Sequence, residues 1–351
     1  MTSILERIRA TAPTDQPPRS GVEDMLVQTY SKRLMVFTGR ANAPLAQAIV
    51  DQLGINLGGV TLKTFSSGEV YSKFDSSIRG ADVFIVQPMC GNPETGVNTN
   101  DALMELLLMI DAAVGASAHR VIAVCPWYGY ARQDKKSAPR EPISARVVAR
   151  ALESTGVDRV LTMDLHAGQL QGFFGIPVDH MTAAGSLAEY FTNFDDNLVV
   201  VAPDAGRVKL NKQFAAQIGA SLAILNKERP QQQMAEITTV IGDVRGKTAL
   251  VIDDMIDTAG TLCAAGETLK KAGATRVLAA ATHGVFSGPA FERLAASPFE
   301  QVVVTDTIPL AKGAPEKIKV LSCAPLLAET IGRIFIDESV SAVFDGKNHT
   351  F

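Results

Sequence analysis

Short apolar segments alternate with amphipathic helical segments along the chain from residue 32 onward, and this alternation constrains the fold more than any other feature. We expect buried strands at residues 33–39, 82–88, 120–129, 159–166, 198–204, 221–227, 247–256, 276–284 and 301–309. Helical patterns lie between them at residues 42–54, 98–116, 143–156, 209–220 and 260–274. Apolar strands that alternate with helices predict parallel sheets covered by helices on both faces. The fold class is therefore α/β, with two domains that are each a mostly parallel sheet flanked by helices.

The chain has 351 residues, a length that favours two domains. The two strand–helix series divide near residue 180. We expect a disordered, polar and Pro-rich N-terminal extension at 1–30 and an N-terminal α/β domain at 31–180. A C-terminal α/β domain is expected at 181–337, followed by a segment at 338–351 that docks on the N-terminal domain.

Composition excludes several classes of protein. The net charge of −4 and pI near 5.8 give no overall attraction to nucleic acid, so anion binding must be local. No apolar run reaches 18 residues, which argues against a membrane span. Four dispersed cysteines without metal-ligand spacing indicate reduced thiols and a cytoplasmic protein.

The segment VIDDMIDTAGTL, residues 251–262, places three acids directly before a turn of small residues that opens a helix. Backbone N–H groups at a helix N-terminus favour a phosphate. The carboxylates of Asp253 and Asp254 can accept hydrogen bonds from vicinal hydroxyls. A ligand that satisfies both ends carries hydroxyls and a phosphate, whereas a plain helix cap needs fewer acids.

This segment resembles the phosphoribosyl-binding loop shared by phosphoribosyltransferases and phosphoribosyl pyrophosphate synthetases. Residues 126–145, PWYGYARQDKKSAPREPISA, carry four basic side chains and resemble the catalytic flexible loop of ribose-phosphate pyrophosphokinases of the bacterial class I type. Further similar segments run in order from residue 32 to the C-terminus, at 64–69, 78–87, 98–107, 164–179, 203–206, 240–247, 282–288 and 306–309. The resemblance implies two phosphoribosyltransferase-like domains.

The resemblance also implies a role for individual residues. The catalytic pair would be Lys227 and Arg229, and the magnesium ligands His166 and Asp204. The ATP-binding residues would be Phe65, Ser67, Gly68, Glu69, Arg132, Gln133 and Lys135, of which the loop around Ser67 would serve a site across a subunit interface. The ribose 5-phosphate site would comprise Asp253, Asp254, Asp257, Thr258, Ala259, Gly260 and Thr261.

The implied reaction is transfer of the pyrophosphoryl group of ATP to the C1 hydroxyl of ribose 5-phosphate, giving 5-phosphoribosyl 1-pyrophosphate and AMP for nucleotide biosynthesis. Phosphoryl chemistry of this kind depends on positioning and on stabilising charge, which suits lysine, arginine and Mg²⁺. The resemblance implies ATP and ribose 5-phosphate as small-molecule partners. It also implies a homo-oligomer, namely a homohexamer that is assembled from dimers. Inorganic phosphate is a candidate activator.

Four positions depart from the usual family pattern: Ser67, Gly175, Arg207 and Glu228. Arg207 would either crowd the site or add a phosphate contact. These departures keep a non-catalytic regulatory paralogue open as the alternative. A phosphoribosyltransferase is disfavoured because the chain carries both ATP-handling segments, YARQDKK and KER.

The C-terminal segment DESVSAVF matches a family segment linked to an allosteric phosphate or ADP site. Candidates for such a site are Ser77, Arg79, Ser339, Ser341 and Phe344. A capped terminal turn that docks on the N-terminal domain is the alternative interpretation.

Overall fold

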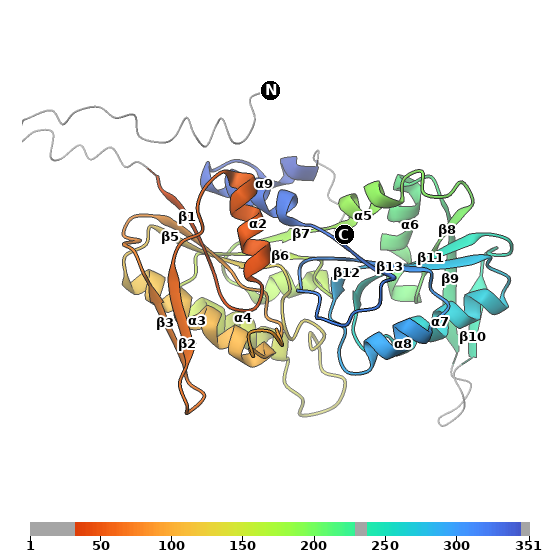
Figure 1. The fold of residues 1–351 in the computed structure, drawn as a ribbon, viewed down its shortest axis with the longest axis horizontal. Helices are drawn as coiled ribbons and strands as arrows, with labels where there is room; N and C mark the ends of the chain where they lie inside the picture. The colour runs from red at the N-terminus through yellow and green to blue at the C-terminus, as the bar shows by residue number, and fades with distance from the viewer. Residues whose placement is uncertain (1–31, 229–236, 345–351) are drawn as a thin grey trace, which may run out of the picture.

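The structure is a computed structural model that describes residues 32–228 and 237–344. The chain forms two α/β domains that lie side by side (Figure 1). The predicted disordered extension at residues 1–30 lies outside the described residues. In the N-terminal half, parallel strands run in the order β1-β4-β5-β6-β7. These strands are β1 (Leu34–Thr38), β4 (Asp82–Val86), β5 (Arg120–Cys125), β6 (Arg159–Met163) and β7 (Val178–Met181).

Helices cover both faces of this sheet. Helix α2 (Ala43–Leu53) lies on one face, and α3 (Thr99–Gly115) and α4 (Ser144–Ser154) lie on the other. The predicted helix boundaries are set by their caps. Asn98 and Asp101 form a capping box at the start of α3, and Gly54 ends α2 in the left-handed region with φ of 66°.

An antiparallel hairpin of β2 (Val60–Thr64) and β3 (Val70–Phe74) stands beside this sheet, and the sequence did not predict it. Its residues are half-buried or exposed and none is fully buried, and Val60, Leu62 and Phe74 pack on the core under α3. The turn at residues 65–69 projects from the molecule (Figure 1).

The C-terminal sheet has the order β10-β9-β8-β11-β12-β13-β14 and is parallel except for the antiparallel edge strand β10. Its strands are β8 (Leu198–Ala202), β9 (Ser221–Glu228), β10 (Ile237–Ile241), β11 (Thr248–Ile256), β12 (Arg276–Gly284), β13 (Gln301–Thr305) and β14 (Ile318–Leu321). Helices α5 (Ala184–Phe191) and α6 (Val208–Gln217) pack on one face, and α7 (Gly260–Lys271) and α8 (Ala290–Ala296) on the other. The predicted α/β class is confirmed.

The predicted boundary between the C-terminal domain and the docking segment differs from the structure. Helix α9 (Ala324–Phe335) leaves the C-terminal sheet and packs against α2, so that Leu327 and Ile331 are fully buried in the N-terminal core. The chain therefore returns to the N-terminal domain near residue 323, not at 338. The short helix η4 (Val340–Phe344) continues on the same surface, where Val340, Val343 and Phe344 pack on this core.

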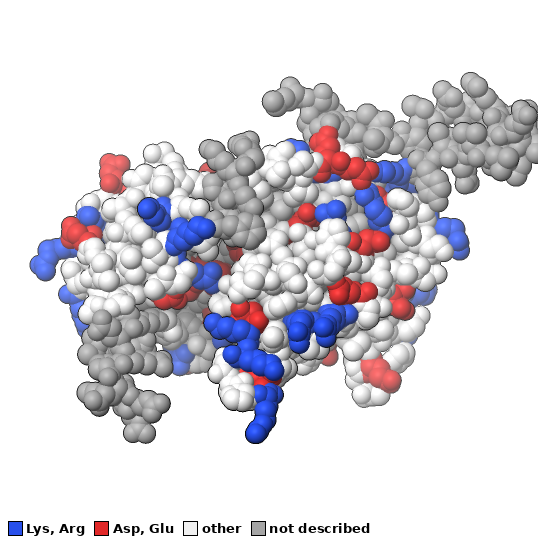
Figure 2. Space-filling model, turned by 180° about the vertical axis from the view of Figure 1, so that it is seen from behind, with Lys and Arg blue, Asp and Glu red and all other residues white. Residues whose placement is uncertain are grey.

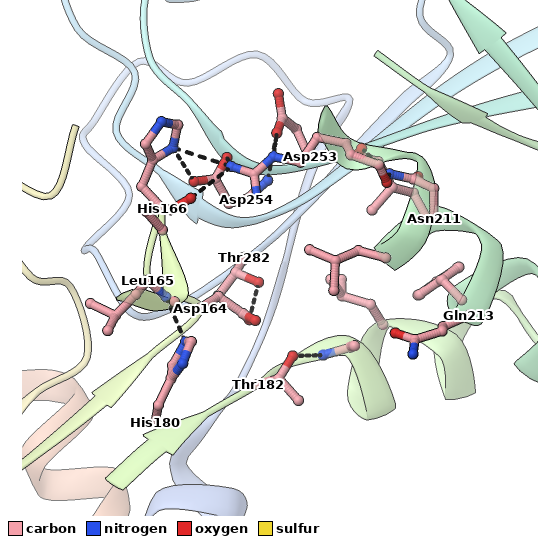
Figure 3. A pocket seen from close by; sticks show the side chains of 18 of the residues that line it. Asp164, Leu165, His166, His180, Thr182, Asn211, Gln213, Asp253, Asp254 and Thr282 are labelled. Carbon is pink, nitrogen blue, oxygen red and sulfur yellow. Dashed lines mark hydrogen bonds and ion pairs between the residues drawn. The ribbon is translucent and has the colours of Figure 1, made fainter. Parts of the chain in front are cut away.

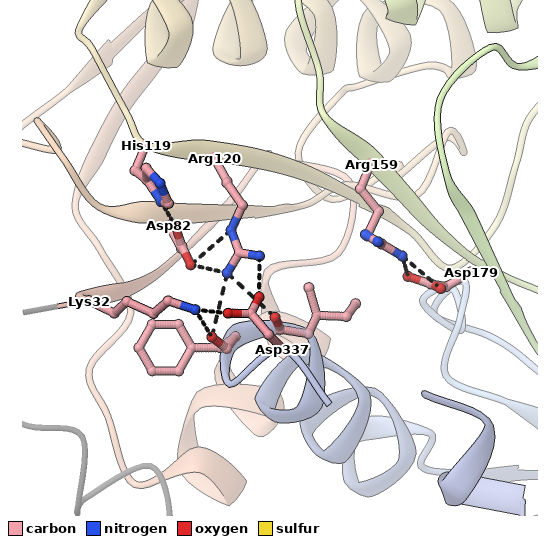
Figure 4. A network of polar contacts seen from close by, with 9 residues as sticks. Lys32, Asp82, His119, Arg120, Arg159, Asp179 and Asp337 are labelled. Atoms are coloured by element: carbon pink, nitrogen blue, oxygen red, sulfur yellow. Dashed lines mark hydrogen bonds and ion pairs between the residues drawn. The ribbon is translucent and has the colours of Figure 1, made fainter. Parts of the chain in front are cut away.

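Ion pairs fasten the returning segment to the first strands. Asp337, just after α9, accepts a hydrogen bond from Arg120 Nη1 at 2.7 Å and pairs with Lys32 (Figure 4). Arg120 also pairs with Asp82, which is 1% exposed and contacts His119 Nδ1 at 2.7 Å. The two ends of the described chain are thus tied to one another through strands β4 and β5.

The carboxyl ends of the two sheets meet, and the contact is polar as well as apolar. Thr282 Oγ1 donates to Asp164 Oδ2 at 2.5 Å, and His283, 1% exposed, contacts the carbonyl oxygen of Met163 at 3.1 Å. A small apolar cluster around Trp127 and Ile308 joins the domains beside these contacts. Ligands of open parallel sheets bind at this edge.

The surface carries charges of both signs. On the face opposite to that of Figure 1, acidic and basic side chains are interspersed, with one basic group at the lower edge (Figure 2). In the described part of the chain, no helix combines the length and apolar character that a bilayer span requires.

We predict that Leu327→Ala lowers stability by about 3 kcal/mol, because it leaves a cavity between α9 and α2. Thermal unfolding followed by circular dichroism would measure the effect. Val147→Ala is the control, because Val147 is 59% exposed and its truncation should change the melting temperature little. Equal melting temperatures for the Leu327 variant and the wild type would contradict the assignment of α9 to the N-terminal core.

Candidate active site

Polar side chains from three neighbouring strand ends converge where the two sheets meet. His166 follows β6 of the N-terminal sheet, Asp204 follows β8, and Asp253 and Asp254 lie near the end of β11. Strands β8 and β11 are direct neighbours, which places their carboxyl ends side by side. The convergence therefore follows from sheet order and not from sequence proximity.

Asp254 is the centre of this convergence (Figure 3). Its Oδ2 lies 2.7 Å from His166 Nδ1, and its Oδ1 accepts from Arg207 Nη2 at 2.6 Å. Arg207 Nε lies 3.2 Å from Asp253 Oδ1. One histidine of the N-terminal domain, two adjacent acids and one arginine thus form a single cluster, which we call the Arg207 cluster.

The two acids of the cluster differ in pKa. Burial raises the pKa of Asp253 to about 7, and its neighbour Asp254 acts in the same direction. Burial also opposes ionisation of Asp254, but the hydrogen bond with His166 and the charge of Arg207 hold its pKa well below the usual range. Asp254 therefore loses its proton at lower pH than Asp253 does.

His166 is oriented by this carboxylate. Arg207 Nη2 lies 3.1 Å from the same nitrogen, so that both contacts that hold the ring are made at Nδ1. Nε2 is the ring nitrogen that these contacts leave for a cation.

The turn after Asp257 has the backbone geometry of an anion site. Ala259 adopts φ of 58° and ψ of 2°, and α7 begins at the next residue. The preceding residue, Thr258, is held from α8, because Arg293 Nη1 donates to its carbonyl oxygen at 2.9 Å. No motif in the sequence points to this arginine.

A cavity of about 350 Å³ lies over this turn. It is lined by all the residues that the resemblance assigned to ribose 5-phosphate, namely Asp253, Asp254, Asp257, Thr258, Ala259, Gly260 and Thr261. His166, Asp204, Arg132 and Arg207 also line it. The cavity therefore brings hydroxyl acceptors, a helix N-terminus and cations into one space.

A second cavity, of about 470 Å³, lies between the domains on the other side of the Arg207 cluster (Figure 3). Lys135 and Arg132 line it on the N-terminal side, and Leu187, Asn211 and Phe214 on the C-terminal side. Both cavities are bounded by Arg132, His166, Arg207, Asp253 and Asp254. The Arg207 cluster consequently separates the two spaces.

The loop at residues 126–145 reaches the turn at residues 257–261, which we call the phosphoribosyl turn after the resemblance that it shows. Arg132 forms an ion pair with Asp257, although 125 residues separate them. Gln133 is held by Ser144, whose hydroxyl donates to its side-chain oxygen. Of the expected ATP residues, Arg132 and Lys135 therefore face the cavities, and Gln133 lies beside Arg132 in a shallow neighbouring depression.

The other expected ATP residues lie apart from these cavities. Phe65, Ser67, Gly68 and Glu69 form the exposed turn of the β2–β3 hairpin, and the described residues that line the cavities do not include them. Ser67 Oγ donates to Glu69 Oε2 at 2.5 Å. Phe65 is 48% exposed and stands edge-on to Tyr71.

The expected catalytic pair is only partly described. Lys227 is the penultimate residue of β9, where its backbone pairs with Thr238 of β10. Because β9 is parallel to β8, Lys227 lies toward the same sheet edge as Asp204. Arg229 falls outside the described residues.

The residues fit a weakly held magnesium ion. His166 and Asp204 line one cavity, and Asp204 accepts a hydrogen bond from the backbone of Arg207 at 3.1 Å. Within residues 32–228 and 237–344, no group of three or more His, Cys, Asp or Glu side chains could hold a metal. Mg²⁺ with few protein ligands keeps waters and substrate phosphates in its coordination shell.

The allosteric candidates fall into two groups. Arg33 Nη2 donates to the carbonyl oxygens of Ser77 and Arg79, at 3.4 and 2.9 Å. Ser339 Oγ and Ser341 Oγ are 2.7 Å apart, and Phe344 packs on the N-terminal core. These contacts agree with the docked terminal turn, and an effector site there stays a prediction.

Comparisons with known proteins agree with this geometry. The N-terminal domain family of ribose phosphate pyrophosphokinase matches residues 34–156, and the phosphoribosyl synthetase-associated domain family matches residues 229–345. Ribose-phosphate pyrophosphokinase of Caldanaerobacter subterraneus is 50% identical over 90% of this chain and 99% of the relative. The corresponding protein of Neisseria meningitidis is 50% identical over 89% and 95%.

A solved structure is also similar. Phosphoribosylpyrophosphate synthetase from Mycobacterium smegmatis superposes with a TM-score of 0.81 at 44% identity, over 87% of this chain and 99% of that chain. Fold and site together define an α/β enzyme whose cavity lies at the carboxyl ends of parallel strands, over the turn that begins α7. The chain belongs to the ribose-phosphate pyrophosphokinase family.

We predict that Asp254→Ala destabilises the protein by about 3 kcal/mol, because it leaves the largely buried Arg207 with only the more exposed Asp253 as a counter-ion. Denaturant unfolding would measure the loss. Asp243→Ala is the matched control, because Asp243 is 71% exposed and its pairing with Lys247 contributes at most about 1 kcal/mol. Similar stability of the two variants would show that the Arg207 cluster does not depend on Asp254.

Proposed function

We propose that this protein transfers the pyrophosphoryl group of ATP to the C1 hydroxyl of ribose 5-phosphate, forming 5-phosphoribosyl 1-pyrophosphate and AMP. The observation that carries the proposal is the ion pair between Arg132 and Asp257. It joins the loop that resembles an ATP-binding loop to the turn that resembles a phosphoribosyl site. Donor and acceptor sites are therefore adjacent across the domain junction.

In this proposal, the phosphate of ribose 5-phosphate binds the backbone N–H groups from Thr258 to Thr261. The hydroxyls bind carboxylate oxygens at the end of β11, which leaves C1 directed toward Arg132. Attack of the C1 oxygen on the β-phosphorus of ATP forms one P–O bond and breaks the bond to the α-phosphate oxygen, releasing AMP. Lys227, Arg229 and Arg132 supply positive charge for the transferring and bridging oxygens.

Magnesium would be held by His166 and Asp204 and would neutralise charge on the phosphate oxygens. The contacts of His166 Nδ1 with Asp254 and Arg207 support this assignment, because they leave Nε2 for the cation. Asp204 lies at the strand end beside β11, so that both groups face the same cavity.

The hairpin turn supports an oligomeric enzyme. Its adenine-contact candidates are exposed and stand apart from the cavities of their own chain, which suits a turn that completes the site of a neighbouring subunit. We propose that the protein is cytoplasmic and forms a homohexamer that is assembled from dimers. Inorganic phosphate acts as an activator at a site formed by Ser77, Arg79, Ser339, Ser341 and Phe344.

The decisive assay incubates the purified protein with ATP, Mg²⁺ and ribose 5-phosphate and quantifies AMP and phosphoribosyl pyrophosphate together. Equal amounts of the two products are expected. No AMP, with or without inorganic phosphate, would overturn the proposal in favour of a regulatory paralogue.

We predict that Lys227→Ala lowers kcat by about 100-fold or more, because it removes a cation from the transferring group. Lys271→Ala is the control, since Lys271 is exposed on the last turn of α7. Circular dichroism would establish that both variants are folded. A kcat close to the wild-type value would remove Lys227 from the mechanism.

A mixing experiment tests the shared site. A hairpin variant, Phe65→Ala with Glu69→Ala, and Lys227→Ala should each be weakly active alone. If subunits exchange at random, about a quarter of the sites in an equal mixture combine an intact hairpin with an intact Lys227. Activity that stays at the level of the parents after exchange would show that the hairpin does not serve a neighbour.

A further inference from the structure

Arg207 contacts more of the site than any role considered from the sequence requires. Its Nη2 lies 2.6 Å from Asp254 Oδ1 and 3.1 Å from His166 Nδ1, and its Nε lies 3.2 Å from Asp253 Oδ1 (Figure 3). The Arg207 side chain is only 14% exposed, although it borders both cavities. Its guanidinium is therefore paired with the two carboxylates and is not a surface cation waiting for a phosphate.

The backbone of Arg207 is held by hydrogen bonds with two neighbouring side chains. Its N–H donates to Asp204 Oδ1 at 3.1 Å, at the start of the short helix η3 (Ala205–Arg207). Its carbonyl oxygen accepts from Asn211 Nδ2 at 3.0 Å. Asn211, 3% exposed, also lies 3.3 Å from the carbonyl oxygen of Ile252, directly before Asp253. Arg207 is thus anchored to both β8 and β11.

The charge pattern explains why a cation is needed there. Asp253 and Asp254 are adjacent and both face the centre of the cluster, so their carboxylates repel one another when ionised. A fork-shaped guanidinium can bind both at once in a fixed planar geometry, whereas the ammonium of lysine is a compact charge on a flexible stem and does not fix the two carboxylates in the same way. It also offsets negative charge where an anionic ligand approaches.

The two carboxylates have different surroundings. Both side chains border the cavity over the phosphoribosyl turn, but that of Asp254 is 6% exposed and is held by Arg207 and His166, whereas that of Asp253 is 33% exposed. Asp253 is consequently the better placed of the two to meet ligand hydroxyls. Asp254 transmits the position of Arg207 to His166.

We propose that Arg207 is a positioning residue that holds the Asp253 carboxylate toward the ribose hydroxyls of ribose 5-phosphate, through the buried pair with Asp254. The inference rests on the proposed function and deepens it. This role differs from a direct contact between Arg207 and the substrate phosphate. In the proposed role, Arg207 affects binding of the hydroxyl end of the ligand, through Asp253.

The test compares two ligands on two variants. Calorimetric titration measures the Kd of ribose 5-phosphate and of 2-deoxyribose 5-phosphate, which keeps the phosphate and lacks one hydroxyl. For Arg207→Gln we expect the Kd of ribose 5-phosphate to rise about 30-fold, as for loss of a charge-assisted hydrogen-bonding partner. The Kd of the deoxy ligand should rise only about threefold, because fewer hydroxyl contacts depend on Asp253.

Arg207→Lys supplies a second variant that keeps the charge without the fork. It should show an intermediate rise in the Kd of ribose 5-phosphate, about fivefold. Lys209→Gln is the matched control, since it removes one positive charge from an exposed position two residues away and should leave both Kd values unchanged. Circular dichroism and thermal unfolding establish that each variant is folded.

Steady-state kinetics adds a readout that a general structural defect would not reproduce. The KM for ribose 5-phosphate should rise in Arg207→Gln while the KM for ATP stays within about twofold. Equal losses for the two sugar phosphates would indicate a phosphate contact and overturn the proposal. Unchanged binding by both Arg207 variants, or equal rises in the two KM values, would overturn it as well.

The wild-type protein separates this proposal from the proposed function. Product formation by the wild type together with unchanged ribose 5-phosphate binding by the variants would remove the role of Arg207 and leave the reaction intact. A wild type that neither binds ribose 5-phosphate nor forms product would overturn both.

Discussion

The buried ion pair between Asp254 and Arg207 is the interaction on which the arrangement of the site depends. A carboxylate at the end of a parallel strand is costly to bury unless it is paired and hydrogen-bonded. Here the arginine comes from the short helix after the neighbouring strand, and the histidine that completes the pairing comes from the other domain. The same contacts that satisfy one acid therefore hold together residues from both halves of the chain.

The strand order makes these contacts possible. Strands β8 and β11 are neighbours although helix α6, strand β9 and strand β10 separate them in the sequence. Parallel strands bring their carboxyl ends to one edge, so that residues after each strand become neighbours without any local sequence relationship. The first sheet contributes His166 at the same edge and Asp164, which Thr282 holds across the junction.

Much of the fold could be predicted from the sequence, because its central strands are apolar runs and its early helices carry clear caps. The hairpin β2–β3 escaped prediction because its strands are short and partly exposed, so that segments such as VTLKT lack the continuous apolar run that marks the central strands. The return of α9 to the N-terminal core is a tertiary event that no local pattern encodes, so the boundary at residue 337 was wrong. At the site, Asp253 to Thr261 stood out by spacing, whereas the contacts of Arg207 and Arg293 required the fold.

The return of α9 has a mechanical consequence. The chain crosses between the domains twice, once between β7 and α5 and again between β14 and α9. Two covalent crossings prevent either sheet from sliding freely over the other and restrict relative motion to rotation about the line that joins them. Because the contact between His166 and Asp254 crosses the junction, any motion that opens the junction there must break it, so that opening the domain junction and dismantling the cluster become one movement.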